Sequence, residues 1–421
     1  MRMISRGYQR ALIGCLLLVN IVNYMDRSLI GILGESLKRD LLLNDTELGL
    51  IAGGVFTVTY SLLGLPAARV ADRGWRKRVV MISVFVWCAM TCSAGLARTF
   101  WELAIARIGV ALGEGGVLPA SHAMISLQVD RERQASAIGL LWVGGSIGAA
   151  LAAFVGGWTN QRFGWRATFV ALGLCGLLLT PLIHFVIRRD QESTDGSVAA
   201  APTLESGTFG VTVRYLASLR SYRMLWLAAG LMVIGQSAYL VYSGPFFIRS
   251  YGLSTMVVGR YIALTVGVGA TVGALTGGRL FDWLGRRSYR LALTVPAVTV
   301  LLSACIGTVG WASDHVSVTA FCLFASTFLY ALVTAPVYTT AQLLAPAHMR
   351  STSAAVLNIG IGAIGMAVGP LLAGVVSDLT RPSLGIHSLR AGLIVVAVLQ
   401  AIGALVLFRA ASAVDDDLAS V

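Results

Sequence analysis

The chain has 421 residues, of which 56% are hydrophobic and 12% charged, and its formal net charge is +12. Soluble domains carry about twice this share of charged residues. The composition therefore excludes a water-soluble globular protein and indicates a protein embedded in the lipid bilayer. In a soluble protein the positive charge would suggest a nucleic-acid partner, so the positions of the basic residues along the chain have to decide that question.

Twelve long stretches almost free of Asp, Glu, Lys and Arg recur along the chain, each close to the ~20 residues that cross the hydrocarbon core as a helix. The first stretch follows Arg2, Arg6 and Arg10 but has no small-residue cleavage site, so we expect a retained span and not a signal peptide. The pattern predicts an all-α membrane protein with spans at 10–33, 47–70, 79–97, 101–127, 134–158, 165–187, 223–248, 255–278, 290–310, 316–341, 351–377 and 388–409.

The basic residues lie mostly on one side of these spans. With the amino terminus in the cytoplasm, 21 of the 32 Lys and Arg residues fall in inside segments, 8 fall in outside segments and 3 fall within spans. The positive-inside rule then predicts both termini in the cytoplasm, as in a bacterial inner membrane. Because topology accounts for the basic charge, we expect no nucleic-acid partner.

Neither metal nor cofactor chemistry is indicated. All six cysteines fall in predicted spans, where they act as small apolar residues, and the five histidines are scattered. We find no spacing typical of a disulfide framework or a zinc site, so we expect no metal and no cofactor. A clustered Ser/His or His/Asp constellation and a nucleotide-binding loop are also missing, which argues against an enzyme and against a primary pump.

The longest polar segment, residues 188–222, separates two groups of six spans that contain matching motifs. The chain reads A-R-V-A-D-R-G-W-R-K-R from Ala68 to Arg78 and G-R-L-F-D-W-L-G-R-R from Gly278 to Arg287. Two parallel six-span repeats are typical of transporters, with the substrate near the midplane between the repeats. The predicted organisation is a six-helix bundle at 1–187, a flexible cytoplasmic linker at 188–222, a second six-helix bundle at 223–409 and a cytoplasmic tail at 410–421.

These repeats resemble the major facilitator superfamily, whose loop between the second and third helices reads G-x-x-x-D-R-x-G-R-R or close to it. Three further motifs are similar to the spinster family of lipid transporters: N-Y-M-D-R from Asn23 to Arg27, R-x-x-x-x-x-G-E-x-x-x-x-P-A from Arg107 to Ala120, and G-P-F-F-I-R at 244–249. The anion:cation symporters of organic acids share the D-R of the first span and the G-E of the fourth. The resemblance implies the major facilitator fold and transport by alternating access.

Four charged residues lie inside predicted spans 1 and 4, where each costs roughly 2.5 to 3.5 kcal/mol on insertion scales. Arg107 and Glu114 are seven residues apart, which places them within about 20° on one helix face. Asp26 and Arg27 are adjacent and point about 100° apart, so one can face a cavity while the other pairs with a neighbouring helix. We predict Asp26 and Glu114 as proton-coupling sites and Arg27 and Arg107 as substrate-binding residues. The alternative is that the four form permanent structural ion pairs.

The second half lacks comparable midplane charges, and its predicted substrate-contacting residues are polar or aromatic. The predicted residues of this half are Gln236, Tyr239, Tyr330 and Asn358, and further candidates are Tyr242, Thr334 and Tyr338. Tyr60 of span 2 is predicted to contact the substrate as well. At the cytoplasmic face we predict a gating motif that latches neighbouring spans, formed by Asp72, Arg73, Arg76, Asp282, Arg286 and Arg287. The alternative for the basic residues is a topology signal alone.

The predicted function is therefore secondary active transport, coupled to protons, of an amphipathic or organic anion such as a lysophospholipid or a sphingolipid-like molecule. The expected partners are the substrate, protons and membrane lipids, and we expect a monomer. Two alternatives stay open within transport: a proton symporter for small organic acids, and a uniporter or exporter driven by substrate alone. A sensor would need an output domain, and the 12 residues after Arg409 are too few for one.

Overall fold

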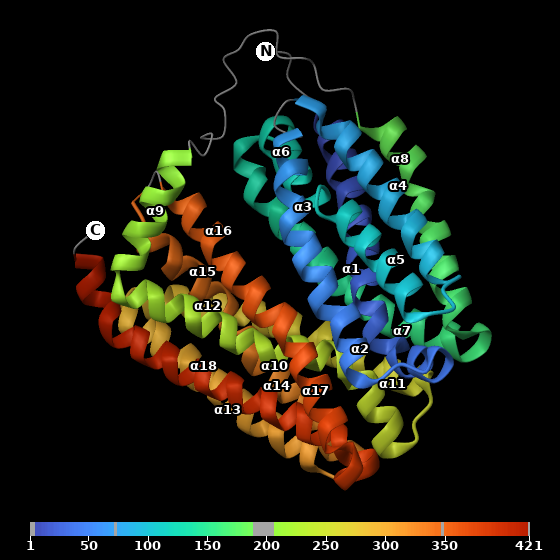
Figure 1. Ribbon diagram of the computed structural model, residues 1–421. Helices are drawn as coiled ribbons and strands as arrows, with labels where there is room; N and C mark the ends of the chain where they lie inside the picture. The colour runs from blue at the N-terminus through green and yellow to red at the C-terminus, as the bar shows by residue number, and fades with distance from the viewer. Residues whose placement is uncertain (1–4, 71–73, 188–205, 347–348, 420–421) are drawn as a thin grey trace. The chain divides into compact units, whose positions relative to one another are not determined.

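The computed structural model describes residues 5–70, 74–187, 206–346 and 349–419, and the regular elements in these ranges are helices (Figure 1). The chain divides into two compact units. The first contains Met1–Leu43, Val55–Thr203 and Ser254–Arg260, and the second contains Asn44–Gly54, Leu204–Leu253 and Tyr261–Val421. Each unit therefore includes a short segment that the sequence places in the other half of the chain.

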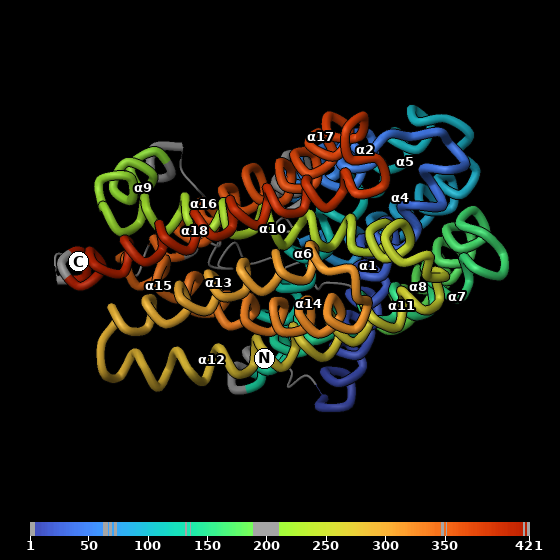
Figure 2. Tube along the Cα trace, turned by 90° about the horizontal axis from the view of Figure 1, so that it is seen from below, coloured from blue at the N-terminus to red at the C-terminus, as the bar shows by residue number. Residues whose placement is uncertain are grey.

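The first unit is built around the long first helix. Helix α1 begins at Arg6, where the Ser5 side chain accepts a hydrogen bond from the backbone N–H of Tyr8, and it packs along α7, while α4 packs against α5 and α7 (Figure 2). The buried core includes Leu12, Leu16 and Trp87. The helices of this unit are α1 (Arg6–Leu41), α3 (Phe56–Val70), α4 (Arg76–Ala94), α5 (Phe100–Glu114), α6 (Val117–Gln128), α7 (Arg131–Leu177) and α8 (Leu179–Val186), together with most of α11 (Thr255–Ile262).

The second unit is built around the last helix. Helix α18 packs along both α10 and α13, α13 packs on α14, and α17 lies against the short α2 (Figure 2). Its α-helices are α2 (Asp45–Gly49), α9 (Ser206–Ser218), α10 (Arg220–Tyr251), α12 (Thr271–Gly285), α13 (Tyr289–Ala312), α14 (Val316–Ala331), α15 (Thr334–Leu343), α16 (Arg350–Gly360), α17 (Ala367–Leu384) and α18 (Ser388–Ala419).

The helices account for the predicted spans. Within the described ranges nine helical stretches are long and apolar enough to cross a membrane. Two of these, Ser136–Val186 and Thr352–Asp415, each hold two predicted spans, so the nine account for eleven of the twelve. The remaining span, at 47–70, is divided among α2, a π-helix over Leu50–Val55 and α3. The predicted all-α, multi-pass membrane architecture is confirmed.

Several spans are interrupted where the sequence suggested continuous helices. Span 4 breaks between α5 and α6 at Gly115 and Gly116. Helix α7 runs through the predicted loop between spans 5 and 6 and is non-helical there only at Gly164, with a φ of 82° and a ψ of 167°. Spans 8 and 11 contain π-helical stretches over Ala263–Ala270 and Ile361–Met366. Such departures from α-helix in transporters often accompany functional sites.

The polar segment at 188–222 is described only from residue 206 onward. This described part is helical and not extended: it forms α9 and the first residues of α10. Helix α9 packs against α10 and α16, with Thr212 and Leu216 buried. Part of the expected linker is thus a helix whose apolar side chains pack against α10 and α16.

Candidate functional site

The four charged residues of spans 1 and 4 form two ion pairs inside the first unit. Arg27 Nε lies 2.5 Å from Glu114 Oε2, and Arg107 Nη1 lies 2.9 Å from Asp26 Oδ2. Asp26 and Arg27 are adjacent on α1 and pair with different residues of α5, because successive helix positions point about 100° apart. The structure therefore brings together the four residues that the sequence singled out, in crossed pairs.

The four residues differ in how far other molecules can reach them. Asp26 is 0% exposed, and Arg107 and Glu114 are each 1% exposed. The Arg27 side chain is 24% exposed, against 0% for the Glu114 side chain with which it pairs. Arg27 is thus the member of this group that an incoming anion can contact, whereas the Arg107–Asp26 pair is enclosed by protein.

Aromatic rings surround the Arg27 guanidinium. Its Cζ atom lies 4.4 Å from the centroid of Tyr60, 5.4 Å from that of Phe56 and 5.5 Å from that of Tyr24. Phe56 also lies 4.9 Å from the Arg107 Cζ atom, between the two cations. Cation–π contacts contribute about 0.5 to 2 kcal/mol each. The rings therefore hold Arg27 in place and give its surroundings an apolar character.

Tyr60 was predicted from the sequence to be at the site, whereas Phe56 and Tyr24 were not. Tyr24 lies three residues before Arg27 on α1, which is the spacing that puts two side chains on one helix face. Phe56 is the first residue of α3, directly after the π-helix over Leu50–Val55. The π-helix has a wider turn than an α-helix, so a regular 3.6-residue repeat through residues 50–55 does not predict which way Phe56 faces.

Helix α4 completes the site through a close approach to α5. A Cβ atom added to Gly113 would lie 2.6 Å from the backbone nitrogen of Trp87, so only glycine allows the two helices to approach this closely. One turn further along α4, the Thr91 hydroxyl lies 2.7 Å from Asp26 Oδ1 and 3.0 Å from the carbonyl oxygen of Trp87. Thr91 was not predicted from the sequence, because a threonine in an apolar helix gives no local signal.

Three buried polar atoms at this site lack a hydrogen-bond partner among the described residues. They are Glu114 Oε1, Arg107 Nε and Asn23 Nδ2. Each such atom costs about 1 to 3 kcal/mol, so protein interiors contain few of them. Two of these atoms belong to the charged group itself, and Asn23 lies three residues before Asp26 on α1, so the polar atoms of the site do not satisfy one another completely.

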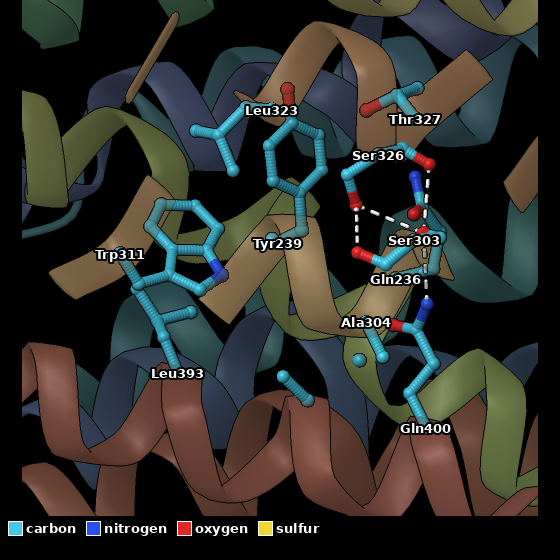
Figure 3. Close-up of a pocket in the computed structure, with 13 residues that line it drawn as sticks. Gln236, Tyr239, Ser303, Ala304, Trp311, Leu323, Ser326, Thr327, Leu393 and Gln400 are labelled. Atoms are coloured by element: carbon cyan, nitrogen blue, oxygen red, sulfur yellow. Dashed lines mark hydrogen bonds between the residues drawn. The ribbon is translucent and has the colours of Figure 1, made fainter. Parts of the chain in front are cut away.

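The second unit contains a small cavity, with room for about one water molecule, between α10, α13, α14 and α18 (Figure 3). Ser303 and Ser326 bridge the two helices α13 and α14, with Oγ atoms 2.9 Å apart, and the Gln400 amide donates to Ser303 Oγ at 3.2 Å. The predicted residues Gln236 and Tyr239 line it, and the described residues of its lining are uncharged. It is a neutral, hydrogen-bonding cavity within one bundle.

The other predicted residues of the second half lie elsewhere. Tyr330 packs at the edge of the apolar core of the second unit, and Tyr338 donates a hydrogen bond to the exposed Asn358 at 2.6 Å. Thr334 is the first residue of α15 and is exposed. None of the four is in the lining of the cavity, so the structure divides the predicted set of this half into separate groups.

A second charged group, of which the sequence predictions named only Tyr242, surrounds the start of α2 in the second unit. Arg249 donates two hydrogen bonds to the Asp45 carboxylate, at 2.9 and 2.8 Å, and the backbone N–H groups of Asp45 and Thr46 donate to Asp378 at 3.1 and 2.7 Å. Tyr242 donates to the Asp45 carbonyl at 2.6 Å. We call this group the Asp45 cluster: Asp45, Thr46, Tyr242, Arg249, Ser377 and Asp378.

Comparison with known proteins identifies the family. A model of the Major Facilitator Superfamily matches residues 16–370. The chain belongs to this superfamily. A relative from Mycolicibacterium smegmatis described as an MFS-type efflux pump is 33% identical over 403 residues, covering 94% of this chain and 91% of the relative. The hexuronate transporter of Bacillus subtilis is 25% identical over 399 residues, covering 92% of each chain.

A solved structure shows the same major facilitator fold. The crystal structure of a bacterial homologue of the human lysosomal transporter Spinster, in an inward-facing and unoccupied conformation, matches with a TM-score of 0.88. The two chains are 23% identical, and the match covers 98% of this chain and 99% of the other. The predicted fold and its spinster-like form are confirmed, and the chain is a membrane transporter and not an enzyme.

The gating motif of this superfamily member is described only in part. Asp72 and Arg73 lie outside the described residues. Arg76 is the first residue of α4, Asp282 and Arg286 are exposed on or beside α12, and Arg287 stacks 4.2 Å from the Trp283 centroid. Within the described ranges Asp282 makes no ion pair, so the latch between spans stays a prediction.

Proposed function

We propose that this transporter couples the movement of an organic anion to protons through Arg27 and Glu114. The observation that carries the proposal is the pairing of a partly exposed Arg27, in its aromatic cage, with a Glu114 side chain that is 0% exposed. The Arg27 guanidinium offers planar donors to a carboxylate or phosphate, and the rings of Tyr24, Phe56 and Tyr60 suit an apolar or aromatic part of the same molecule.

The coupling follows from competition for one cation. An anion that binds Arg27 weakens its bond to Glu114 Oε2. An unpaired carboxylate in a buried site raises the free energy by several kcal/mol. The Glu114 carboxylate therefore binds a proton when Arg27 leaves it. When the anion leaves, Arg27 returns to Glu114 and favours release of the proton. Substrate and proton then bind together, which is the requirement for a symporter.

The proposed substrate class is an organic anion, and the candidates are small aromatic acids, sugar acids and lysophospholipid-like amphiphiles. The hexuronate transporter among the relatives supports the first group. The efflux pump, which is 33% identical, supports a second candidate function, the export of amphipathic compounds. We further propose a bacterial cytoplasmic membrane and cytoplasmic termini, supported by 21 of 32 basic residues lying in the predicted inside segments.

The test uses the purified full chain in proteoliposomes with an imposed pH gradient. Labelled hexuronate, an aromatic carboxylate and a lysophospholipid are offered in turn, and both accumulation and counterflow are measured. We expect gradient-driven accumulation of at least one anion by the wild type. Glu114→Gln should abolish this accumulation and retain counterflow, because it removes the proton site and keeps the shape of the side chain.

The matched control is Glu102→Gln, which makes the same change at an exposed position in the first turn of the same helix and should transport like the wild type. Accumulation that survives in Glu114→Gln would contradict the assigned proton site. If only outward movement of the lysophospholipid responds to the gradient, the export candidate is favoured. If none of the three anions moves, the substrate class is wrong.

A further inference from the structure

Thr91 offers one hydroxyl proton to two acceptors beside a buried carboxylate. Its Oγ1 atom lies 2.7 Å from Asp26 Oδ1 and 3.0 Å from the Trp87 carbonyl oxygen. A hydroxyl has one proton, so it donates to only one of these acceptors at a time, while its oxygen can still accept a bond. Thr91 is 1% exposed and Asp26 is 0% exposed, so this choice is made within the protein.

The two choices correspond to the two protonation states of Asp26. When the carboxylate is ionised, Thr91 donates to Oδ1 and Arg107 donates to Oδ2 at 2.9 Å. When Oδ1 carries a proton, that O–H donates to the Thr91 oxygen, and the Thr91 hydroxyl turns to the Trp87 carbonyl. The Arg107 bond is kept in both states. Neither state moves a heavy atom, and in both states Thr91 Oγ1, the Asp26 carboxyl group and Arg107 Nη1 keep a hydrogen bond.

Glu114 lacks such an arrangement. Its Oε2 atom is held by Arg27, and its Oε1 atom is buried with no partner among the described residues. A proton on Oε1 would therefore have no acceptor unless the side chain moved, and an unpaired buried donor is costly. In this conformation the two carboxyl groups thus differ: only Asp26 can change its protonation by reorienting a hydroxyl.

We propose that Thr91 is a positioning residue that lets Asp26 bind and release a proton without rearrangement of the site. The proposal rests on proton-coupled transport as proposed above, and it adds Asp26 to Glu114 as a second group that can carry a proton. The proton comes from water and returns to water, and only O–H bonds form and break. The other titratable or charged groups near Asp26 are Arg107 and Glu114 from α5, Cys88 from α4 and Arg27 on α1. They are the same in the wild type and in the Thr91 variants, so they do not account for a difference between these proteins.

The experiment is infrared difference spectroscopy of the full chain in lipid over a pH series. The carboxylic C=O band of Asp26 is assigned by its loss in Asp26→Asn. In Thr91→Val we expect this band at higher frequency, because the carboxyl O–H no longer has an acceptor. The ionised form also loses a charge-assisted bond, so the pH dependence of the band should differ between Thr91→Val and the wild type. Thr91→Ser should restore both the frequency and the pH dependence.

Thr276→Val is the matched control, because the Thr276 hydroxyl donates to its own helix carbonyl at Val272 (2.7 Å) and contacts no carboxylate. It should leave the band unchanged. Thr91→Ala serves as a second variant if Thr91→Val does not fold. A wild type without an Asp26 band, or Thr91 variants with the wild-type frequency and pH dependence, would overturn the inference even if transport is proton-driven. Absence of pH-driven transport with an intact Asp26 titration would instead overturn the proposed function.

Discussion

Arg27 and Arg107 each pair with a buried carboxylate, but the two arginines differ in their exposure to solvent. Arg27 is 24% exposed in an aromatic cage, whereas the Arg107 side chain is 2% exposed and faces Asp26 at 2.9 Å. From the sequence both were expected to bind substrate. The geometry supports an anion-binding role for Arg27, and for Arg107 it supports keeping Asp26 charged, since a buried carboxylate needs a partner.

We predict that Arg107→Met destabilises the protein by about 3 to 5 kcal/mol at neutral pH, the usual cost of an unpaired buried charge. Unfolding in detergent, followed by tryptophan fluorescence, measures the loss. Adding Asp26→Asn should recover most of the loss. A single variant as stable as the wild type at neutral pH would refute the structural role of Arg107.

At the scale of helices, glycine allows both a break between two spans and a close contact of two helices. Gly164 has a φ of 82° within α7 and separates the spans predicted at 134–158 and 165–187. Gly113 permits the contact of α5 with α4 that brings Thr91 to Asp26. The hydropathy pattern placed the boundary near Gly164 correctly. An average over 18 apolar residues is insensitive to one glycine, so it predicted neither the contact at Gly113 nor the break of span 4 at Gly115 and Gly116.

We expect Gly164→Ala to lower stability by roughly 1 to 3 kcal/mol, because its φ and ψ belong to a region that is essentially restricted to glycine. Gly139→Ala on the same helix is the matched control. A Cβ atom at Gly139 meets nothing within 4 Å, so that change should be neutral or stabilise slightly. Melting temperatures in detergent compare the two. Equal effects would mean that the conformation at Gly164 does not constrain the chain.

At the scale of the whole molecule, the compact units differ from the halves of the sequence. Residues 44–54 precede the linker, but they belong to the second unit, where Arg249, Asp378 and Tyr242 hold the start of α2. Residues 254–260 belong likewise to the first unit, where Thr255 donates a hydrogen bond to the Gly157 carbonyl at 3.1 Å. The first half of the sequence therefore contributes residues 44–54 to the second unit, and the second half contributes residues 254–260 to the first unit.

The predicted topology can be tested by cysteine labelling in intact cells. Ser5→Cys and Ser412→Cys should react with a membrane-impermeant maleimide only after permeabilisation, whereas Asp314→Cys, in the loop between α13 and α14, should react directly. The wild type controls for Cys175 and Cys305, which are exposed on the surface of their units. Direct labelling at either terminal position would contradict cytoplasmic termini.

The sequence by itself determined the membrane class, the twelve spans, the two repeats and the four charged candidates. These depend on the cost of placing each residue in hydrocarbon, which is a local property. Only the tertiary structure decided which carboxylate pairs with which arginine, that Thr91 contacts Asp26, and that the Asp45 cluster exists. Those contacts join residues far apart in sequence, such as Asp45 and Asp378, and depend on the rotation and packing of whole helices, which hydropathy does not encode.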